Sequence, residues 1–462
     1  MPLRPSRRTL RFALILTFPF LGVGGAGAQT SSIPPETREA AQRLIQAALE
    51  SPVTWERLGA LVDTYGSRPS GSEALEAALD WILEKMEADG LENVRSEPVM
   101  VPRWVRGMET AELVSPRLKK MTILGLGPSV PTPLEGIRAE VLVVDSFEDL
   151  QARSSEARGK IVLFDVPFTT YGETVQYRFQ GAVAAARAGA VASLVRSITP
   201  FSMNTPHTGG MGYEEGVPRI PHAALTLEDA AMLHRMQDRG ERIEVHLTMA
   251  SLDEGMVPSR NVMGELVGRE FPNEVVVLGG HTDSWDVGQG AMDDGGGVVA
   301  AWEAVRLMKE LGLRPRRTVR VVGWVAEEVG IFGGQAYAEA PAREEERHVL
   351  GIESDAGVFS PVGFGFTGSD EAFPILEEIG RILDPIGAGE ITRGGGEADI
   401  GPMVERGMPG MGLEVDGTRY FWYHHTDADT LDKLDPEEVA RCVAAMAVMA
   451  YVIADLPDPL PR

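Results

Sequence analysis

Short apolar runs, rich in β-branched residues, recur through the second half of the chain. They cover residues 275–281, 318–326 and 349–352, and such runs are typical of buried strands. Between the first two, apolar positions recur at helical spacing over residues 298–311. Strands that alternate with helices are typical of a parallel sheet covered by helices. The pattern therefore predicts a mixed α/β fold with a mostly parallel sheet flanked by helices.

Helical periodicity marks both flanks of this region. Two amphipathic helical stretches are predicted before about Leu91, one of them over residues 72–89, and both should pack on the sheet. A final helix is predicted to begin at Asp435, because aspartate is a good N-cap. Its apolar run, residues 439–453, contains Arg441 and is shorter than the roughly 20 residues that span a bilayer. We therefore expect it in the core or at a dimer surface.

The middle of the chain shows a different pattern, of short strands with an alanine-rich helix. Apolar runs cover residues 141–144 and 161–164, and the helical stretch 181–190 is followed by another run at residues 191–195. This pattern predicts a separate α/β lobe inserted into the chain. The predicted parts of the mature protein are an N-terminal helical part of the main domain, the insert and the main domain: residues 29–114, 115–255 and 256–462.

The first 28 residues are typical of a cleavable export signal. Four arginines lie between Arg4 and Arg11, residues 12–23 are mostly apolar, and residues 26–28 read Ala-Gly-Ala, an A-x-A cleavage site. Cleavage there predicts a secreted or periplasmic protein. Two alternatives stay open: the apolar stretch could act as a short signal anchor, and Ser6-Arg7-Arg8 resembles the start of a twin-arginine signal.

The chain is strongly acidic, with a formal net charge of −25, which becomes −29 when the four arginines of the signal are removed. Such a protein repels a phosphate backbone, so the charge argues against nucleic acid as a partner. Cys442 is the only cysteine and allows no disulfide within the chain. A hydrophobic core must therefore supply the stability, and a chain of this length can bury one.

Side chains able to bind a metal follow the ends of the predicted strands, lie in a glycine-rich stretch at residues 289–297, and occur near the end of the chain. Open α/β sheets gather their chemistry at the carboxyl ends of the strands. Isolated acidic pairs and single histidines are mostly solvated or structural. Two charges directly after a buried strand, however, are costly unless they are paired or bind a metal. Two zinc-class ions that share one carboxylate need about this set: His281, Asp293, Glu328, Asp355 and His425, with Glu327 beside the third.

Four blocks of the sequence resemble peptidase family M28, a family of di-zinc exopeptidases. Residues 280–294 read GHTDSWDVGQGAMDD, and shorter blocks read AEEVG, SD and HTDADT at residues 326–330, 354–355 and 425–430. The resemblance covers nearly the whole mature chain. It implies the zinc exopeptidase fold, peptide substrates, and an insert of the protease-associated type.

The resemblance also implies a role for each metal-binding side chain. Asp293 would bridge two zinc ions. His281 and Asp355 would complete one site, while Glu328 and His425 would complete the other. Zinc is the usual metal for mixed histidine and carboxylate ligands, although cobalt or manganese could replace it.

Glu327 would be the general base in such a site. Two metals roughly 3.5 to 4 Å apart acidify a shared water, and a carboxylate beside that water can take its proton and pass it to the leaving amine. Asp283, two residues after His281, would orient that histidine, as metal-bound imidazoles require. Its alternative role is to cap the end of the strand.

Two further residues, His424 and Asp399, lie outside this ligand set. The family spacing from a histidine to Asp429 fits His425, so His424 would instead meet the substrate or its oxyanion. Many aminopeptidases of the family carry Ser-Asp-His where this chain has Ala398-Asp399-Ile400. The missing histidine argues against a simple aminopeptidase and favours a branch for which dipeptides are substrates. Asp399 could cap a loop or take part in function.

The sequence thus predicts an exported di-zinc exopeptidase that hydrolyses dipeptides or short peptides, has no membrane span in its mature form, and could form a homodimer. One alternative is an aminopeptidase of the same family. Others are a different amide reaction on the same scaffold, such as glutaminyl cyclisation, and a non-catalytic binding protein. The binding protein is disfavoured because every ligand and the base are present.

Overall fold

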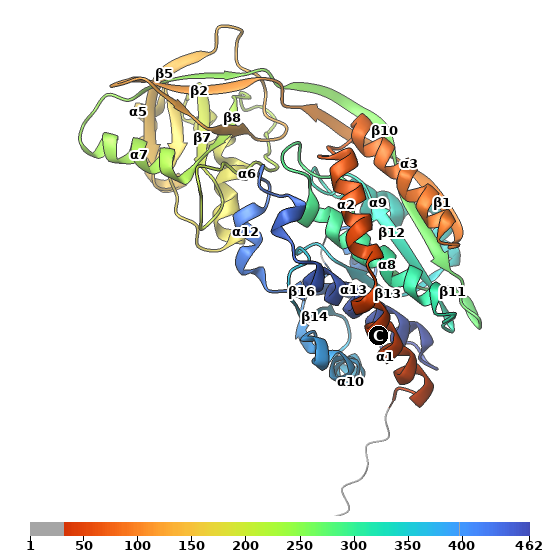
Figure 1. Ribbon diagram of the computed structural model, residues 1–462. Coiled ribbons are helices and arrows are strands. Elements are labelled where there is room, and N and C mark those ends of the chain that lie inside the picture. Colours follow the sequence, from red (N-terminus) through yellow and green to blue (C-terminus); the bar gives the residue numbers. More distant parts are fainter. Residues whose placement is uncertain (1–31, 397) are drawn as a thin grey trace, which may run out of the picture. The chain divides into compact units, whose positions relative to one another are not determined.

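Two mixed eight-stranded sheets organise the part of the chain that the structure describes. That structure is a computed structural model and covers residues 32–396 and 398–462 (Figure 1). The predicted signal, residues 1–28, lies outside the described residues. The mixed α/β fold predicted from the sequence is confirmed.

The first sheet has the predicted strands at its centre. Strands β12, β11, β13 and β16 run parallel to one another, and β10 and β14 flank them in the antiparallel direction. In spatial order the strands are β1 (Glu92–Val105), β10 (Leu252–Leu266), β12 (Arg317–Trp324), β11 (Phe271–His281), β13 (Arg347–Glu353), β16 (Gly410–Val415), β14 (Pro361–Thr367) and β15 (Glu390–Arg393).

Alternate residues of β11 face two different helical layers, because successive side chains of a strand point to opposite faces. Val276 and Leu278 belong to the larger core. Val275 and Val277 belong to a smaller cluster that contains side chains of α9 (Phe332–Glu339) and α11 (Gly401–Glu405). The helices of the larger core are α1 (Pro35–Glu50), α2 (Val53–Tyr65), α3 (Glu73–Ala88), α8 (Gly296–Glu310), α10 (Phe373–Leu383) and α13 (Pro436–Asp455).

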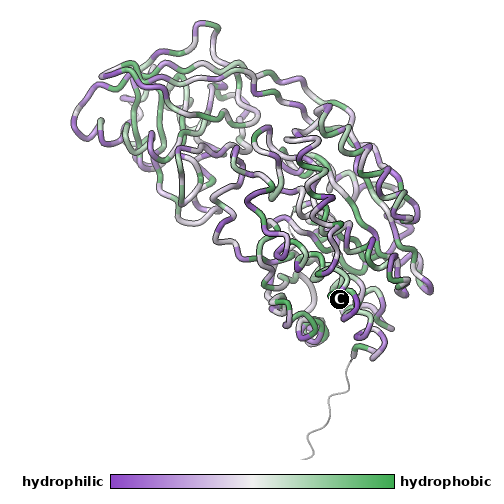
Figure 2. Tube along the Cα trace, viewed as in Figure 1, coloured by the Kyte–Doolittle hydropathy of each residue, from purple (hydrophilic) through white to green (hydrophobic). Residues whose placement is uncertain are grey.

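The terminal helices differ in one respect from their prediction. Three helices, α1 to α3, precede the first strand where the pattern predicted two, because Ser51 and Pro52 separate α1 from α2. Along α3, hydrophilic and hydrophobic residues alternate within each turn (Figure 2), as a half-buried helix requires. Helix α13 begins as predicted, since the Asp435 carboxylate accepts hydrogen bonds from the backbone N–H groups of Glu437 and Glu438. Within the described ranges, no helix is long and apolar enough to cross a membrane.

The second sheet is built from residues 109–249, which we call the second lobe (Figure 1). Its helices are α4 (Phe147–Ala152), α5 (Ser154–Ala157), α6 (Tyr171–Arg187) and α7 (Leu227–Asp238). Its strands, in spatial order, are β3 (Lys119–Met121), β2 (Glu109–Ser115), β9 (Glu244–Met249), β5 (Ile137–Val144), β6 (Ile161–Phe164), β7 (Ala192–Arg196), β8 (His222–Leu225) and β4 (Ile123–Gly125).

The second lobe enters and leaves the first sheet at one place. Strand β1 ends at Val105, which pairs with Leu252 at the start of β10. The lobe therefore occupies the position of a hairpin loop between two antiparallel neighbours. Its sheet begins at Glu109, earlier than the change of pattern at residue 115 indicated.

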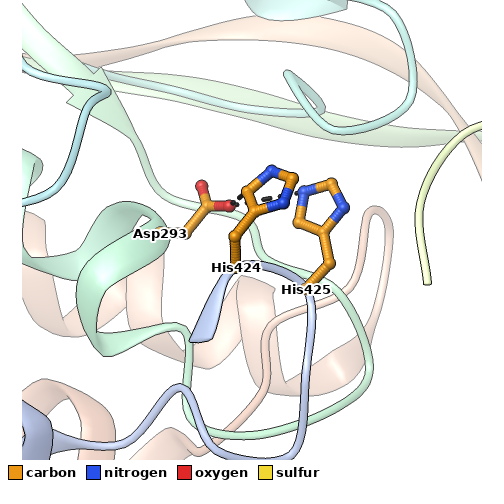
Figure 3. A group of neighbouring side chains, drawn as sticks. All are labelled: Asp293, His424 and His425. Atoms are coloured by element: carbon orange, nitrogen blue, oxygen red, sulfur yellow. Dashed lines mark ion pairs between the residues drawn. The ribbon is translucent and has the colours of Figure 1, made fainter. Parts of the chain in front are cut away.

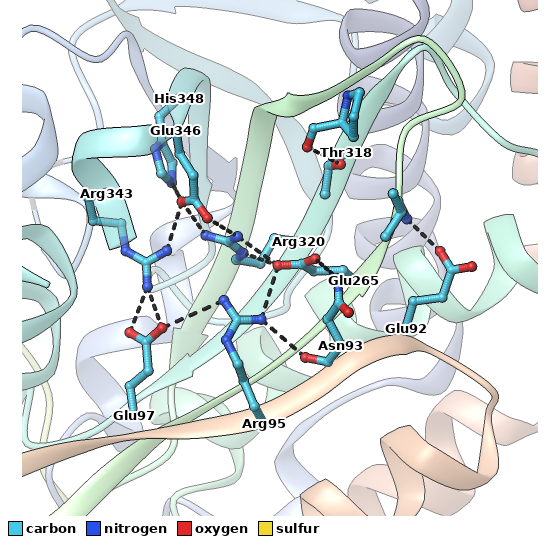
Figure 4. Close-up of polar contacts among 12 residues, drawn as sticks. Glu92, Asn93, Arg95, Glu97, Glu265, Thr318, Arg320, Arg343, Glu346 and His348 are labelled. Atoms are coloured by element: carbon cyan, nitrogen blue, oxygen red, sulfur yellow. Dashed lines mark hydrogen bonds and ion pairs between the residues drawn. The ribbon is translucent and has the colours of Figure 1, made fainter. Parts of the chain in front are cut away.

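A buried network of ion pairs lies on the first sheet at the amino-terminal side of β13 (Figure 4). Arg320, only 3% exposed, donates to Glu265 over 2.7 Å and to Glu346 over 2.8 Å. Arg343 donates to the same Glu346 carboxylate over 2.8 Å. Although burial opposes ionisation, these arginines hold the pKa of Glu346 at about 2. The network therefore stays ionised and holds β10, β12 and the segment before β13 together.

Replacing Arg320 by methionine should destabilise the fold by about 3–5 kcal/mol, because it leaves the buried Glu265 and the half-buried Glu346 without their shared cation. Urea denaturation followed by circular dichroism measures this loss. The control is Arg393→Met, which removes an exposed pair with Asp370 and should leave the urea midpoint unchanged. Equal midpoints for wild type and Arg320→Met would contradict a stabilising role for the network.

Candidate metal centre

The first group of candidate ligands lies at the carboxyl end of β11. His281, the last residue of that strand, is buried. Its Nε2 lies 3.1 Å from Asp293 Oδ1 and 3.2 Å from Asp355 Oδ1. Asp293 belongs to the short turn η1 (Ala291–Gly295) before α8, and Asp355 follows β13. Their ligand atoms are close enough together for one metal ion to bind all three.

A second group shares Asp293 with the first. His425 Nε2 lies 3.3 Å from Asp293 Oδ2 and 3.0 Å from Glu328 Oε2. His424 Nε2 lies 3.7 Å from the same Asp293 oxygen, and the two imidazole rings stack with their centroids 3.5 Å apart (Figure 3). Both histidines follow the short helix α12 (Tyr420–Tyr423). By their positions alone, both histidines thus lie close enough to bind a metal ion that Asp293 also binds.

The state of the carboxylates fits a bound cation. Asp293 Oδ2 and Glu328 Oε1 are buried and accept no hydrogen bond from the described residues. Burial raises the pKa of Glu328, and the negative charge of Asp293 raises it further. Burial likewise raises the pKa of Asp355. A metal cation would offset this desolvation and repulsion, and imidazole with carboxylate is a ligand set that zinc prefers.

Glu327 lies beside these groups, and their charges act on its carboxyl. Burial raises its pKa well above the ordinary value, and the nearby Asp355 charge raises it further. Its backbone N–H donates to Asp283 Oδ1 over 3.2 Å, which fixes the start of the Glu327-Glu328 pair. The preceding residue, Ala326, has a left-handed φ of 59°, a conformation that costs a non-glycine residue energy and occurs preferentially at functional sites.

A cavity of about 660 Å³ lies over both groups. This volume is within the range of sites for small molecules and short peptides. Its floor contains Asp293, Glu327, Glu328, Asp355 and His425. Its walls come from the main part of the chain and from the second lobe, and include Trp104, Trp285, Phe332, Tyr171, Arg178 and Met211.

Known proteins are similar to this chain in sequence and in fold. Residues 261–450 match peptidase family M28. The chain is 49% identical to carboxypeptidase Q of Mus musculus over 409 residues, which cover 88% of this chain and 87% of that protein. The chain belongs to peptidase family M28. The sequence resemblance is confirmed, and with it the prediction of a metallopeptidase related to carboxypeptidase Q.

Solved structures agree with this membership. A peptidase M28 precursor from Shewanella amazonensis SB2B is 35% identical, with a TM-score of 0.88 over 92% of this chain and 98% of that one. A zinc aminopeptidase from Bacillus subtilis is 19% identical, with a TM-score of 0.65 over 88% of this chain and 98% of that one. The second comparison shows the shared fold only.

Asp429 holds the turn that carries Asp293 in this peptidase. The Asp429 carboxylate accepts backbone hydrogen bonds from Ala291 at 3.1 Å, Met292 at 2.7 Å and Asp293 at 3.2 Å. Burial raises the pKa of Asp429 to about 7. In the sequence, Asp429 served only to choose between two histidines. No local pattern indicates that the partners of its carboxylate lie more than 130 residues earlier.

Arg68 is a second positioning residue that the sequence analysis missed. It is fully buried and donates to the carbonyl oxygens of Thr282 at 2.8 Å, Gln289 at 2.7 Å and Gly290 at 2.9 Å. Its guanidinium thus connects the segment after His281 to the turn before α8. It also brings a positive charge near the acidic cluster.

The carbonyl group of Asp283 contacts the first ligand histidine. The backbone oxygen of Asp283 lies 3.0 Å from His281 Nδ1, whereas the carboxylate oxygen Oδ1 lies 3.7 Å from it. A hydrogen bond from Nδ1 to that carbonyl leaves Nε2 free to bind a metal. The Asp283 carboxylate contacts Glu327 instead, so one residue positions a ligand and the candidate base.

Asp399 lies in a buried loop behind the centre and is 1% exposed. Its Oδ1 accepts a hydrogen bond from the Gly334 N–H over 3.1 Å, and its own N–H donates to Glu353 over 2.7 Å. Burial raises its pKa well above the ordinary value, and the charge of Glu353 adds to this. These contacts connect the loop to α9 and to the end of β13, close behind Asp355.

The second lobe contacts the histidine pair directly. His425 Nδ1 lies 3.2 Å from the Thr208 carbonyl oxygen, and the Thr208 N–H donates to the His425 carbonyl over 3.0 Å. His207 Nδ1 lies 2.7 Å from the His424 carbonyl oxygen. His425 has a left-handed φ of 61°, so these contacts support a conformation that a histidine adopts at a cost.

Asp429→Ala should weaken metal binding about 10- to 100-fold, because three backbone amides of the Asp293 turn lose their acceptor. Titration of the metal-free peptidase with zinc, followed by a competing chelator dye, measures the affinity. Asp427→Ala, an exposed aspartate two residues away, is the matched control and should bind as wild type does. Unchanged affinity in Asp429→Ala would refute the positioning role.

Proposed function

We propose that this peptidase is an exported di-zinc exopeptidase that hydrolyses dipeptides or short peptides. One observation carries the proposal: Asp293 lies between two groups of ligand atoms on the floor of one cavity. A carboxylate shared in this way suits a two-metal site. Identity of about half of the residues to a carboxypeptidase supports action on peptides with a free terminus.

The proposed first metal site consists of His281, Asp293 and Asp355. The second consists of Asp293, Glu328 and His425. We assign His425 rather than His424 to the second site, because His425 also contacts Glu328 and its Nδ1 faces the Thr208 carbonyl. A second hydrogen bond of this kind is usual for a metal-bound imidazole.

When bound, two zinc ions would supply Lewis acidity and lower the pKa of a water between them. Glu327 would accept the proton of the attacking water, because its carboxylate lies beside the ligands and takes no part in either group. It would then donate that proton to the leaving amine. Burial lowers the pKa of His424 well below its ordinary value, so its ring stays neutral and can donate a hydrogen bond to the substrate oxyanion.

The second lobe would act as a protease-associated domain that forms one wall of the cavity. Apart from β2, which lies almost wholly before it, the strands and helices of this lobe lie within the insert of residues 115–255 that the sequence predicted. Residues 29–114 and 256–462 would form the catalytic domain. Export through the signal at residues 1–28 and a homodimer stay predictions.

Aminopeptidase activity is the second candidate. Carboxylates predominate among the charged side chains that line the cavity, and they would favour a substrate with a free amino group. A dipeptide has both free termini, so the two activities differ in which terminus is required.

The purified peptidase should contain about two zinc ions per chain, and Asp293→Ala should contain fewer than one, because it removes the carboxylate common to both groups. Mass spectrometry of metal content after gel filtration measures this. Asp253→Ala, an exposed aspartate on β10, serves as the control. If Asp293→Ala retained the metal content of wild type, a bridging role for Asp293 would be excluded.

Glu327→Gln should keep both metal ions and lose about 100- to 10,000-fold in kcat on a free dipeptide, because glutamine cannot accept a proton from water. Glu328→Ala should lose metal as well as activity. Metal analysis combined with a dipeptide hydrolysis assay separates the two variants. Activity retained in Glu327→Gln would exclude it as the base.

A further inference from the structure

Arg178 of helix α6 is the only lysine or arginine among the residues that line the cavity in the described chain. The other charged groups there, apart from the histidines, are carboxylates: Asp286, Asp293, Glu327, Glu328 and Asp355. The metals would neutralise most of these carboxylates. Arg178 would then be the fixed positive charge of the second lobe that faces the substrate.

The guanidinium of Arg178 is held by neutral groups. Nε donates to the Gly210 carbonyl over 3.2 Å, Nη1 to the Thr208 carbonyl over 3.3 Å and Nη2 to the Tyr171 hydroxyl over 2.8 Å. Between them, Gly209 has a φ of 142°, and a Cβ at that position would lie 2.4 Å from Cζ of Arg178. Residues 208–210 therefore fit closely round the guanidinium and fix its plane.

Arg178 has no carboxylate partner among the described residues, although it is only 6% exposed. Two other buried arginines differ: Arg106 pairs with Asp286, and Arg320 with Glu265. A buried cation without a counter-ion costs free energy. An anion that enters the cavity would remove that cost.

The hydrogen-bond capacity of the group matches a carboxylate. A guanidinium has five N–H donors, and three of them make the bonds given above, so one N–H remains on each of Nη1 and Nη2. Two such donors form the fork that binds both oxygens of a carboxylate. Tyr171 accepts from Nη2, which leaves its own hydroxyl hydrogen free to donate to the same ligand.

Contacts connect this group to the metal centre. The Tyr171 ring packs edge-on against the His424 ring, with centroids 5.6 Å apart. His424 in turn lies 3.7 Å from Asp293. The guanidinium thus belongs to the wall next to the candidate oxyanion contact, and two side chains, Tyr171 and His424, connect it to Asp293.

We propose that Arg178, supported by Tyr171, binds the free α-carboxylate at the C-terminus of the substrate. This inference rests on the proposed exopeptidase function and adds the terminus that is recognised. The residue after the cleaved bond would then carry the bound carboxylate, which limits that side of the substrate to one residue and favours dipeptides.

Arg178→Gln tests the proposal, with Arg187→Gln as the matched control on the exposed side of the same helix. The substrates are a free dipeptide with neutral side chains, its C-terminal amide, and an amide whose second residue is glutamate. In wild type the free dipeptide should exceed its amide in kcat/KM by about 10- to 100-fold, the range for hydrogen bonds to a charged group. Arg178→Gln should lose this preference through a higher KM for the free dipeptide, while its kcat/KM for the neutral amide stays that of wild type. Arg187→Gln should match wild type.

Tyr171→Phe gives an independent variant if Arg178→Gln folds poorly, and it should reduce the same preference several-fold. Equal rates for the free dipeptide and its amide in wild type would overturn the proposal. So would an equal loss on both substrates in Arg178→Gln. A wild-type preference for the glutamyl amide over the neutral amide, lost in Arg178→Gln, would assign Arg178 to an acidic side chain and overturn binding of the terminus.

A binding measurement separates this proposal from the exopeptidase function itself. Calorimetric titration of zinc-loaded Glu327→Gln with the free dipeptide and its amide requires no turnover. Tighter binding of the free dipeptide, lost when Arg178→Gln is added, supports the carboxylate contact even if no peptide is cleaved. Equal binding of both peptides would overturn the contact while leaving peptidase activity unaffected.

Discussion

Negative charge is concentrated at the carboxyl edge of the first sheet, where the buried Asp293 and the half-buried Glu328 and Asp355 lie beside one another. Ionised carboxylates in such a place repel one another and lose their hydration. The surrounding structure opposes this cost with the buried Arg68 and with imidazoles directed at Asp293. A metal cation is the remaining partner that this arrangement needs, which is why the fold and the chemistry of the site cannot be separated.

The parts of this centre that the sequence predicted are those attached to strong local patterns. His281 and Glu328 end or follow apolar runs, and β11, β12, α8 and α13 lie where periodicity placed them. The pattern failed where a helix break was short, as at Pro52, and where a strand lay outside the apolar runs, as β2 does at Glu109. Arg68 and Asp429 were not found, because a buried arginine that donates to carbonyl groups looks in sequence like any surface arginine.

The role of the insert could not be predicted for a similar reason. Its strands were visible as apolar runs, but the contacts that matter come from loops without periodicity. Thr208 reaches His425 through its backbone oxygen, which no residue type encodes. Arg178 lies on a helix whose alanine-rich part dominated the pattern, and only the folded chain shows that its guanidinium faces the cavity.

The contact between Thr208 and His425 has a thermodynamic consequence. If the position of the second lobe affects the affinity of a ligand at His425, then occupancy of that site must affect the position of the lobe by the same free energy. Strands β1 and β10 connect the lobe to the first sheet through one paired ribbon, and the contacts of residues 207 and 208 with the histidine pair are among those that a displacement of the lobe would break. Metal binding at His425 and closure of the substrate cavity by the lobe would then be linked by one coupling free energy.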